Sequence, residues 1–254
     1  MADQRAQARG EPSSRGRSRT DDQKLLRAQP YADTSFLESD AWRALRILGE
    51  FVEGFDALAR LGPAVSIFGS ARTRRSDRAY KQARLLGRRL AEEGFTVITG
   101  GGPGVMEAAN RGAREANGVS VGLAIDLPHE QSVNKYVDLV VYDRYFFVRK
   151  TMFVKYAQAF VIFPGGYGTL DELFESLTLV QTGKIDHFPI LLVGSSYWEG
   201  LLEWLRGPVV GERKIDPPDM DLFRVSDDME EIVEHIANAF RESRAADASA
   251  RPEI

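Results

Sequence analysis

The chain has 254 residues, 43% of them apolar, so it can bury one large hydrophobic core with appendages. It has no cysteine, which excludes disulfides, thiolate catalysis and cysteine-ligated metals. Its three histidines, His129, His187 and His235, are not spaced as metal pairs, so we expect surface or packing roles and no metal site. The formal net charge of -4 gives no general attraction to nucleic acid or to an anionic membrane. No run approaches the ~18 apolar residues of a membrane span, and the N-terminus lacks a secretory signal, so we expect a cytoplasmic protein.

The N-terminal part separates into an arm and a helix. Residues 1–30 are polar and rich in arginine, a composition that cannot bury enough apolar surface to order itself, so we expect a disordered arm. Within residues 31–62, Ser39 or Asp40 is suited to cap a helix whose apolar positions follow helical spacing. These positions are Trp42, Leu45, Leu48, Phe51, Val52, Phe55 and Leu58. We expect that face to pack on the body of the protein or on a second subunit.

Residues 63–243 alternate between short apolar runs and amphipathic stretches, without an internal repeat or a second core. We expect strands at 65–68, 95–98, 120–125, 139–142, 160–163 and 190–193. Helices are expected around 77–93, 104–116, 145–157, 169–182, 197–206 and 229–240, and a polar tail at 244–254 should fray. Buried strands that alternate with helices predict an α/β fold, a doubly wound parallel sheet with helices on both faces.

Several strand ends carry residues suited to a ligand site. In an open parallel sheet, ligands bind beyond the carboxyl ends of the strands, where the strand order switches. The unusual strand ends are residues 69–72, 100–104, the loop around 128–130, and 164–172. We expect these segments to converge on one crevice.

The most informative segment is residues 164–172, Pro-Gly-Gly-Tyr-Gly-Thr-Leu-Asp-Glu, which follows the apolar run Ala159 to Phe163. A strand, a glycine-dense turn and a helix beginning near Thr169 favour phosphate binding, because backbone N–H groups and the helix dipole face the anion. The dinucleotide fingerprint is absent, since Val105 stands where its last glycine would fall, and no lysine completes a Walker A loop. The turns can hold a phosphate or a sugar without the signature of NAD or ATP.

Glu172 has two interpretations. Thr169 and Glu172 form the spacing of a helix capping box, in which the carboxylate only satisfies a backbone N–H, and spacing alone favours this interpretation. Asp171 and Glu175 bring the acids of this turn to three, which is more than a cap requires. A carboxylate beside a phosphate site could instead have a chemical role.

Two further features stay open on sequence grounds. Arg149 and Lys150 lie in an otherwise apolar helix. They either lie at its solvent-facing rim or point into the crevice. In the crevice, the planar guanidinium group of the arginine could hold a ribose, a phosphate or a carboxylate. The run Gly100 to Gly104 is either a tight strand-to-helix turn or part of a ligand site. Met106, just after it, could floor a base pocket or pack in the core.

Together these pieces resemble the LOG ("lonely guy") family of cytokinin riboside 5'-monophosphate phosphoribohydrolases, which have a Rossmann-like fold. The family motif P-G-G-x-G-T-x-x-E stands in full at residues 164–172, and the family's Arg-Lys pair, which precedes the motif, matches Arg149-Lys150. The glycine turn at 100–102 with Met106, and the turn Gly69-Ser70, also match. The resemblance covers about residues 62–207. The chain departs from the plant-like segment Met-His-x-Arg-Lys, since Phe146-Phe147-Val148 precede its Arg-Lys pair.

The resemblance implies a reaction and its residues. It implies hydrolysis of the N-glycosidic bond of a nucleoside 5'-monophosphate, with Arg149 and Glu172 as the catalytic pair, no cofactor, and a homo-oligomer, a dimer or larger. Substrate contacts are expected from Gly69, Ser70, Gly101, Gly102, Met106, Glu130, Lys150, Gly165, Gly166, Tyr167, Gly168, Thr169, Asp171 and Thr178. The alternative function is a non-catalytic nucleotide or cofactor carrier, for which the phosphate cradle alone would suffice.

Overall fold

The computed structural model describes residues 39–125, 133–185 and 188–250, and its contacts divide the chain into two units, residues 1–43 and 44–254. The arm expected at 1–30 lies outside the described residues. Helix α2 spans Asp40–Leu58. The Ser39 hydroxyl accepts a hydrogen bond from the backbone N–H of Trp42 at 3.4 Å, so Ser39 occupies the capping position.

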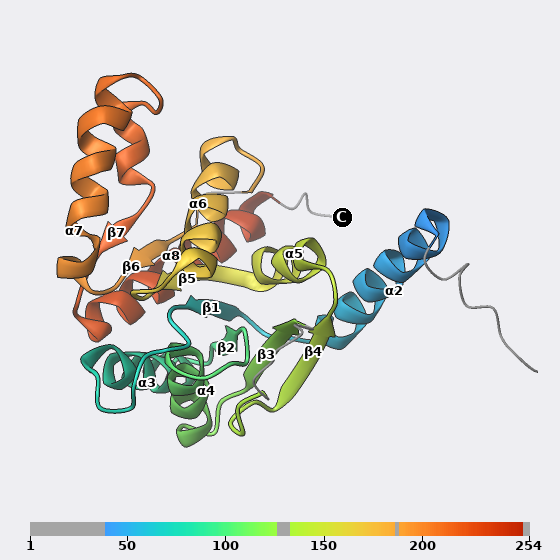
Figure 1. The fold of residues 1–254 in the computed structure, drawn as a ribbon. Coiled ribbons are helices and arrows are strands. Elements are labelled where there is room, and N and C mark those ends of the chain that lie inside the picture. The colour runs from blue at the N-terminus through green and yellow to red at the C-terminus, as the bar shows by residue number, and fades with distance from the viewer. Residues whose placement is uncertain (1–38, 126–132, 186–187, 251–254) are drawn as a thin grey trace, which may run out of the picture. The chain divides into compact units, whose positions relative to one another are not determined.

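A single parallel sheet organises the second unit (Figure 1). Its strands are β1 (Ala64–Phe68), β2 (Thr96–Thr99), β3 (Ser120–Ile125), β4 (Leu139–Asp143), β5 (Ala157–Ile162), β6 (Ile190–Leu192) and β7 (Arg224–Val225). They pair in the order β4-β3-β2-β1-β5-β6-β7, and each pair is parallel. The doubly wound α/β fold expected from the sequence is confirmed. Strand β7 was not expected, because two residues are too few to show a period.

The strand order reverses beside β1. From β1 the chain adds β2, β3 and β4 in one direction, and β5 then returns to pair with the free edge of β1. The loops that leave β1 and β5 at their carboxyl ends therefore turn to opposite faces and open a crevice between them. Residues 69–72 and 163–168 follow these two strands directly.

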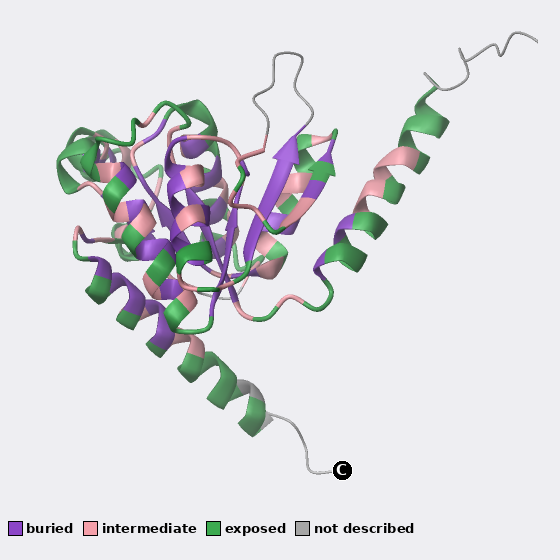
Figure 2. Ribbon diagram, turned by 90° about the horizontal axis from the view of Figure 1, so that it is seen from below, coloured by how far each residue is buried: buried purple, intermediate pink, exposed green. Residues whose placement is uncertain are grey.

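Helices cover both faces of the sheet (Figures 1 and 2). One face carries α3 (Arg78–Glu92), α4 (Val105–Glu115) and α8 (Met229–Ala250). The other carries α5 (Phe146–Tyr156), α6 (Tyr167–Gln181), α7 (Ser195–Trp204) and residues from the C-terminal half of α2. A π-helical turn (Leu205–Val209) and a 3-10 helix (Pro217–Asp221) follow α7. Residues 244–250 of the tail that was expected to fray are instead part of α8, which continues to Ala250, and residues 251–254 lie outside the described residues.

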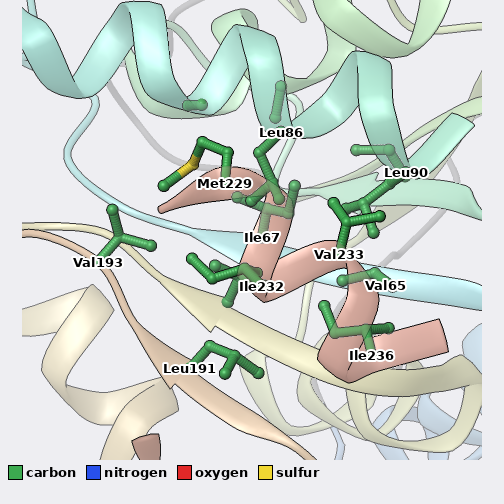
Figure 3. Close-up of a cluster of buried hydrophobic side chains, with 14 of the residues drawn as sticks. Val65, Ile67, Leu86, Leu90, Leu191, Val193, Met229, Ile232, Val233 and Ile236 are labelled. Carbon is green, nitrogen blue, oxygen red and sulfur yellow. The ribbon is translucent and has the colours of Figure 1, made fainter. Parts of the chain in front are cut away.

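Alternation along β1 explains why the sheet needs two helical layers. Val65 and Ile67 are fully buried against α3, α4 and α8, as Figure 3 shows, whereas Ala64 and Phe68 point to the opposite core. Successive strand residues face opposite sides, so a strand that is apolar throughout must be covered on both. Among the described residues, no helix is long and apolar enough to cross a membrane.

Candidate active site

A cavity of about 690 Å³ opens at the carboxyl ends of β1 and β5. The loop after β1 forms one wall, and the glycine turn with the first turns of α6 forms the other. Helix α5 contributes Phe146 and Arg149, Gly100 lies at the end of β2, and Tyr197 enters from α7. The strand ends at 69–72, 100 and 165–172 therefore converge on one crevice, at the position where the strand order reverses.

The glycine turn is held in place from both sides. The backbone N–H of Ser70 donates to the Pro164 carbonyl at 3.0 Å, which joins the loops after β1 and β5. The Tyr197 hydroxyl donates to the Gly165 carbonyl at 2.6 Å. A Cβ at Gly165 would overlap the side chain of Thr169, so only glycine lets the turn close onto that buried threonine. The turn is thus a rigid part of the cavity wall.

Helix α6 begins earlier than the sequence spacing indicated. Gly166 is the capping residue and Tyr167 the first helical residue, without a side-chain cap. Thr169 is therefore the third helical residue, and its own N–H donates to the Gly166 carbonyl at 3.0 Å. The capping-box interpretation of Thr169 and Glu172 is wrong, because Glu172 lies in the second turn, beyond the reach of the free N–H groups at the helix start.

Glu172 is a buried acid within the cavity wall. Its exposed fraction is 9%, and its Oε2 atom has no hydrogen-bond partner among the described residues. Burial raises the pKa of its carboxyl group to about 7; Lys150 and Arg149 oppose this rise, and the charges of Glu175 and Asp171 add to it. A carboxyl group with a pKa near neutrality can accept or donate a proton under physiological conditions.

Lys150 supports the acids of α6 from the neighbouring helix. Its ammonium group lies 2.9 Å from the Asp171 carboxylate and 3.0 Å from that of Glu175. Burial opposes the charge on Lys150, but the two carboxylates outweigh burial and raise its pKa. Because Lys150 is engaged by Asp171 and Glu175, it influences Glu172 through its charge and joins α5 to α6 at the edge of the cavity.

Arg149 is directed into the crevice. It lines the cavity, and its guanidinium carbon lies 5.3 Å from the centre of the Phe153 ring, a cation–π contact. A side chain at Gly100 would collide with the guanidinium group, so the glycine at the end of β2 leaves room for it. The positive charge of Arg149 is close enough to Glu172 to oppose the rise of its pKa.

Most residues proposed from the sequence line this cavity. Those that do are Gly69, Ser70, Met106, Arg149, Gly165, Gly166, Tyr167, Gly168, Thr169, Asp171 and Glu172. Gly101, Gly102, Lys150 and Thr178 do not line it, and Glu130 lies outside the described residues.

The residues away from the cavity have other contacts. The carbonyl groups of Gly101 and Gly102 accept hydrogen bonds from the side chain of Asn134, which ties the turn after β2 to the segment before β4. The Thr178 hydroxyl donates to the Phe174 carbonyl within α6. These contacts show local structural roles for the three residues.

Sequence reasoning missed some residues of the cavity. Arg72 was noted only as part of a strand-end segment, and Phe146 only within the apolar stretch before Arg149. Tyr197 carries no motif, since it reaches the turn from a helix 32 residues away in sequence. Only three-dimensional packing brings such a residue to the site.

The comparisons with known proteins agree with this fold and show the family. The geometry places this chain in the class of doubly wound α/β proteins that have a glycine turn and a buried acid at the cavity. A family model described as "Possible lysine decarboxylase" matches residues 106–236. The chain belongs to this family, the LOG family.

Two relatives illustrate the similarity in sequence. The cytokinin riboside 5'-monophosphate phosphoribohydrolase of Mycobacterium tuberculosis is 30% identical over 149 residues, which are 58% of this chain and 79% of the relative. A probable cytokinin riboside 5'-monophosphate phosphoribohydrolase of Oryza sativa subsp. japonica is 33% identical over 187 residues, 70% of this chain and 79% of the relative.

Solved structures support the fold. The molybdenum cofactor binding protein of Rippkaea orientalis has a TM-score of 0.52 and 21% identity, over 71% of this chain and 99% of that protein. The molybdenum cofactor carrier protein of Chlamydomonas reinhardtii has a TM-score of 0.50 and 20% identity, over 70% and 98% of the two chains. At these identities the similarity concerns the fold alone.

Proposed function

We propose that this protein hydrolyses the N-glycosidic bond of a nucleoside 5'-monophosphate, AMP or a cytokinin riboside 5'-monophosphate, to the free base and ribose 5-phosphate. The observation that carries the proposal is Glu172, a buried carboxyl group with a pKa of about 7 in the wall of a cavity that also contains Arg149 and the glycine turn. The sequence relatives named as phosphoribohydrolases support the same reaction.

The 5'-phosphate is expected to bind at the start of α6. Gly166 and Gly168 have open space where a Cβ would stand, so an anion can approach the backbone there. The first N–H groups of α6 have no partners within the helix, and the helix dipole favours negative charge at this end. Arg72, in the loop after β1, lines the facing wall of the cavity and adds a positive charge.

Glu172 is expected to act on the ribose. Breaking the glycosidic bond develops positive charge on the sugar, which a nearby carboxylate stabilises. The Glu172 carboxylate takes a proton from the attacking water, the water oxygen bonds to the anomeric carbon, and the carbon–nitrogen bond breaks toward the base. The departing base nitrogen takes up a proton from solvent, and Glu172 returns its proton to solvent, which restores the carboxylate. Arg149 orients the ribose or assists the leaving base.

The proposal is tested by incubating the protein with AMP and quantifying adenine and ribose 5-phosphate. Glu172→Gln should lower turnover by about 100-fold or more, as loss of a general base does, while nucleotide binding largely survives. Arg149→Ala should also lower turnover. Glu234→Gln, an exposed position on α8, is the matched control and should leave the rate unchanged.

Two results would count against this function. Near-normal turnover of the Glu172→Gln variant would exclude the carboxylate as the catalytic base. Binding of several nucleotides without any product from the unaltered protein would favour the carrier function instead.

We also propose that the protein assembles as a homodimer or a larger homo-oligomer. Helix α2 leaves Leu45, Leu48 and Val52 each 59% exposed and Phe55 38% exposed, while Leu58 of the same helix is fully buried. A row of exposed apolar side chains on one helix is typical of an interaction surface. Size-exclusion chromatography with and without residues 1–60 tests it: loss of the larger species on truncation is expected, and an unchanged mass would refute it.

A further inference from the structure

A second cavity lies away from the candidate active site, where α2 meets the turn between β4 and α5. Its volume is about 580 Å³, and no residue lines both cavities. Helix α2 contributes Glu50 and Glu53, and the end of β4 contributes Asp143. In Figure 1 the C-terminal half of α2 lies beside β4 at this point. Three acidic residues therefore line one cavity.

Asp143 is the unusual member of this group. Its exposed fraction is 1%, and neither carboxyl oxygen has a hydrogen-bond partner among the described residues. Its backbone is fixed by the sheet, where it pairs in register with Ile125 of β3. Burying a carboxylate without a partner costs several kcal/mol, so such a group calls for a proton or a cation.

The surrounding charges do not supply that partner. Glu50 uses one carboxyl oxygen to accept the backbone N–H groups of Arg144 and Tyr145 at 3.1 and 3.3 Å. The pKa of Asp143 is raised to about 6, chiefly by burial; the charges of Glu50 and Glu53 add to this rise, and the charge of Arg149 opposes it. The guanidinium groups of Arg46 and Arg144, which line the same cavity, form no hydrogen bond with Asp143.

The chemistry of the missing partner follows from this arrangement. Among the described residues no three acids or histidines are grouped closely enough to hold a metal ion. An ammonium or guanidinium group suits the cavity better, because its several N–H donors can reach carboxylates that are spread around it. We propose that this cavity binds a positively charged nitrogen group, with exposed Glu53 as its contact and Asp143 as a buried negative charge behind the cavity wall that attracts it.

This cation can come from two sources with the same chemistry. One is a small amine that enters from solution. The other is a lysine or arginine side chain of a second copy of this chain, since the exposed apolar positions Leu45, Leu48 and Val52 lie on the same helix as Glu50 and Glu53. Neither source depends on the nucleotide chemistry proposed for the other cavity.

The first arm of the test measures free amines. Putrescine, spermidine and agmatine are titrated into the full-length protein at pH 7.5 by calorimetry and by thermal unfolding, with sodium chloride and magnesium chloride at matched ionic strength. Amine binding by the unaltered protein should weaken at least 10-fold in Asp143→Asn and less in Glu53→Gln. It should also weaken below about pH 6, as Asp143 takes up a proton. Glu234→Gln is the exposed control.

The second arm measures self-association by light scattering after size-exclusion chromatography. If the cation comes from a second copy, Asp143→Asn should raise the dissociation constant of the oligomer at least 10-fold. Free amines should then leave the melting temperature of the protein unchanged. In either case the unliganded Asp143→Asn monomer should melt at the same temperature as the unaltered monomer or at a higher one, because the substitution removes an unpaired buried charge.

Three results would overturn the inference. They are magnesium binding in preference to the amines, no effect of Asp143→Asn or Glu53→Gln in either arm, or a clear loss of melting temperature in Asp143→Asn. The last result would show a structural contact of the carboxylate. Glu53→Gln tests the cavity at an exposed position, where the substitution leaves the core unchanged.

Discussion

Replacing Glu172 by glutamine should make the protein more stable at alkaline pH, although it should abolish activity. In the folded protein, burial raises the pKa of Glu172 to about 7 from 4.5. At 1.36 kcal/mol for each tenfold change, these two values correspond to a penalty of about 3 kcal/mol on the folded state once pH exceeds 8. The neutral amide avoids this penalty but must itself be desolvated, so we expect a gain of about 1–3 kcal/mol.

The sign of the pH dependence follows from the direction of the pKa shift. Below pH 4.5 the carboxyl group is protonated in both the folded and the unfolded protein, so the penalty vanishes. As pH rises from 4.5 to about 7, the unfolded chain loses its proton while the folded protein keeps it, so the penalty grows and then levels off once the buried group ionises. The stability gained from the amide should therefore be below about 1 kcal/mol at pH 5 and reach its full value near pH 8.

Urea unfolding at pH 5, 6.5 and 8 measures this difference, with the fluorescence of the buried Trp198 as one reporter. Glu234→Gln, on the surface of α8, is the control and should show no such trend. If Glu172→Gln is less stable than the unaltered protein at pH 8, or if the difference is the same at all three pH values, the carboxylate is paired in the folded protein. The reasoning from burial would then fail.

Three further predictions concern the same crevice. Gly168→Ala should be at least as stable as the unaltered protein, because alanine favours a helix by about 1 kcal/mol and its Cβ meets nothing within 4 Å. Nucleotide binding by this variant, measured by calorimetry, should nevertheless weaken. The rate of hydrolysis should rise with pH through about 7, and Lys150→Gln should move this rise to higher pH, because the lysine charge lowers the pKa of Glu172. Gly104→Ala should destabilise the fold by about 1–3 kcal/mol in urea, since Gly104 has φ 70° and its Cβ would collide with backbone atoms of Ser70 and Ala71.

Most of the fold could be predicted from the sequence because its strands are mostly apolar and its helices are amphipathic. Strand β3 was predicted with the bounds that it has, Ser120–Ile125. The sequence-based predictions were wrong where the segment is too short to show a hydrophobic period or shows none. Strand β7 has two residues, and α8 runs ten residues past its last strongly apolar position, Phe240, with a mostly exposed surface. Polar side chains of that kind carry no pattern that separates a helix from a tail.

Parts of the candidate site could not be predicted from the sequence for a different reason. The glycine motif identified the turn, but the first helical residue depends on backbone geometry, so the spacing of Thr169 and Glu172 suggested a cap that does not exist. Tyr197 and Asp143 belong to no motif. Their positions are set by α7 packing beside the turn and by β4 pairing with β3, which are contacts between distant parts of the chain.

The position at which α6 begins explains how Glu172 could act on the ribose although a phosphate is expected to bind nearby. With Gly166 as the cap, Gly168 is the second residue of α6 and Glu172 the sixth, so the two lie on one face, about 6 Å apart along the axis. A phosphate held by the first amides would be one turn away from the carboxylate. Burial keeps Glu172 largely neutral below pH 7, which reduces its repulsion of the phosphate. Above about pH 7 the carboxylate is ionised, so it can take the proton of the attacking water and stabilise the positive charge that develops on the ribose.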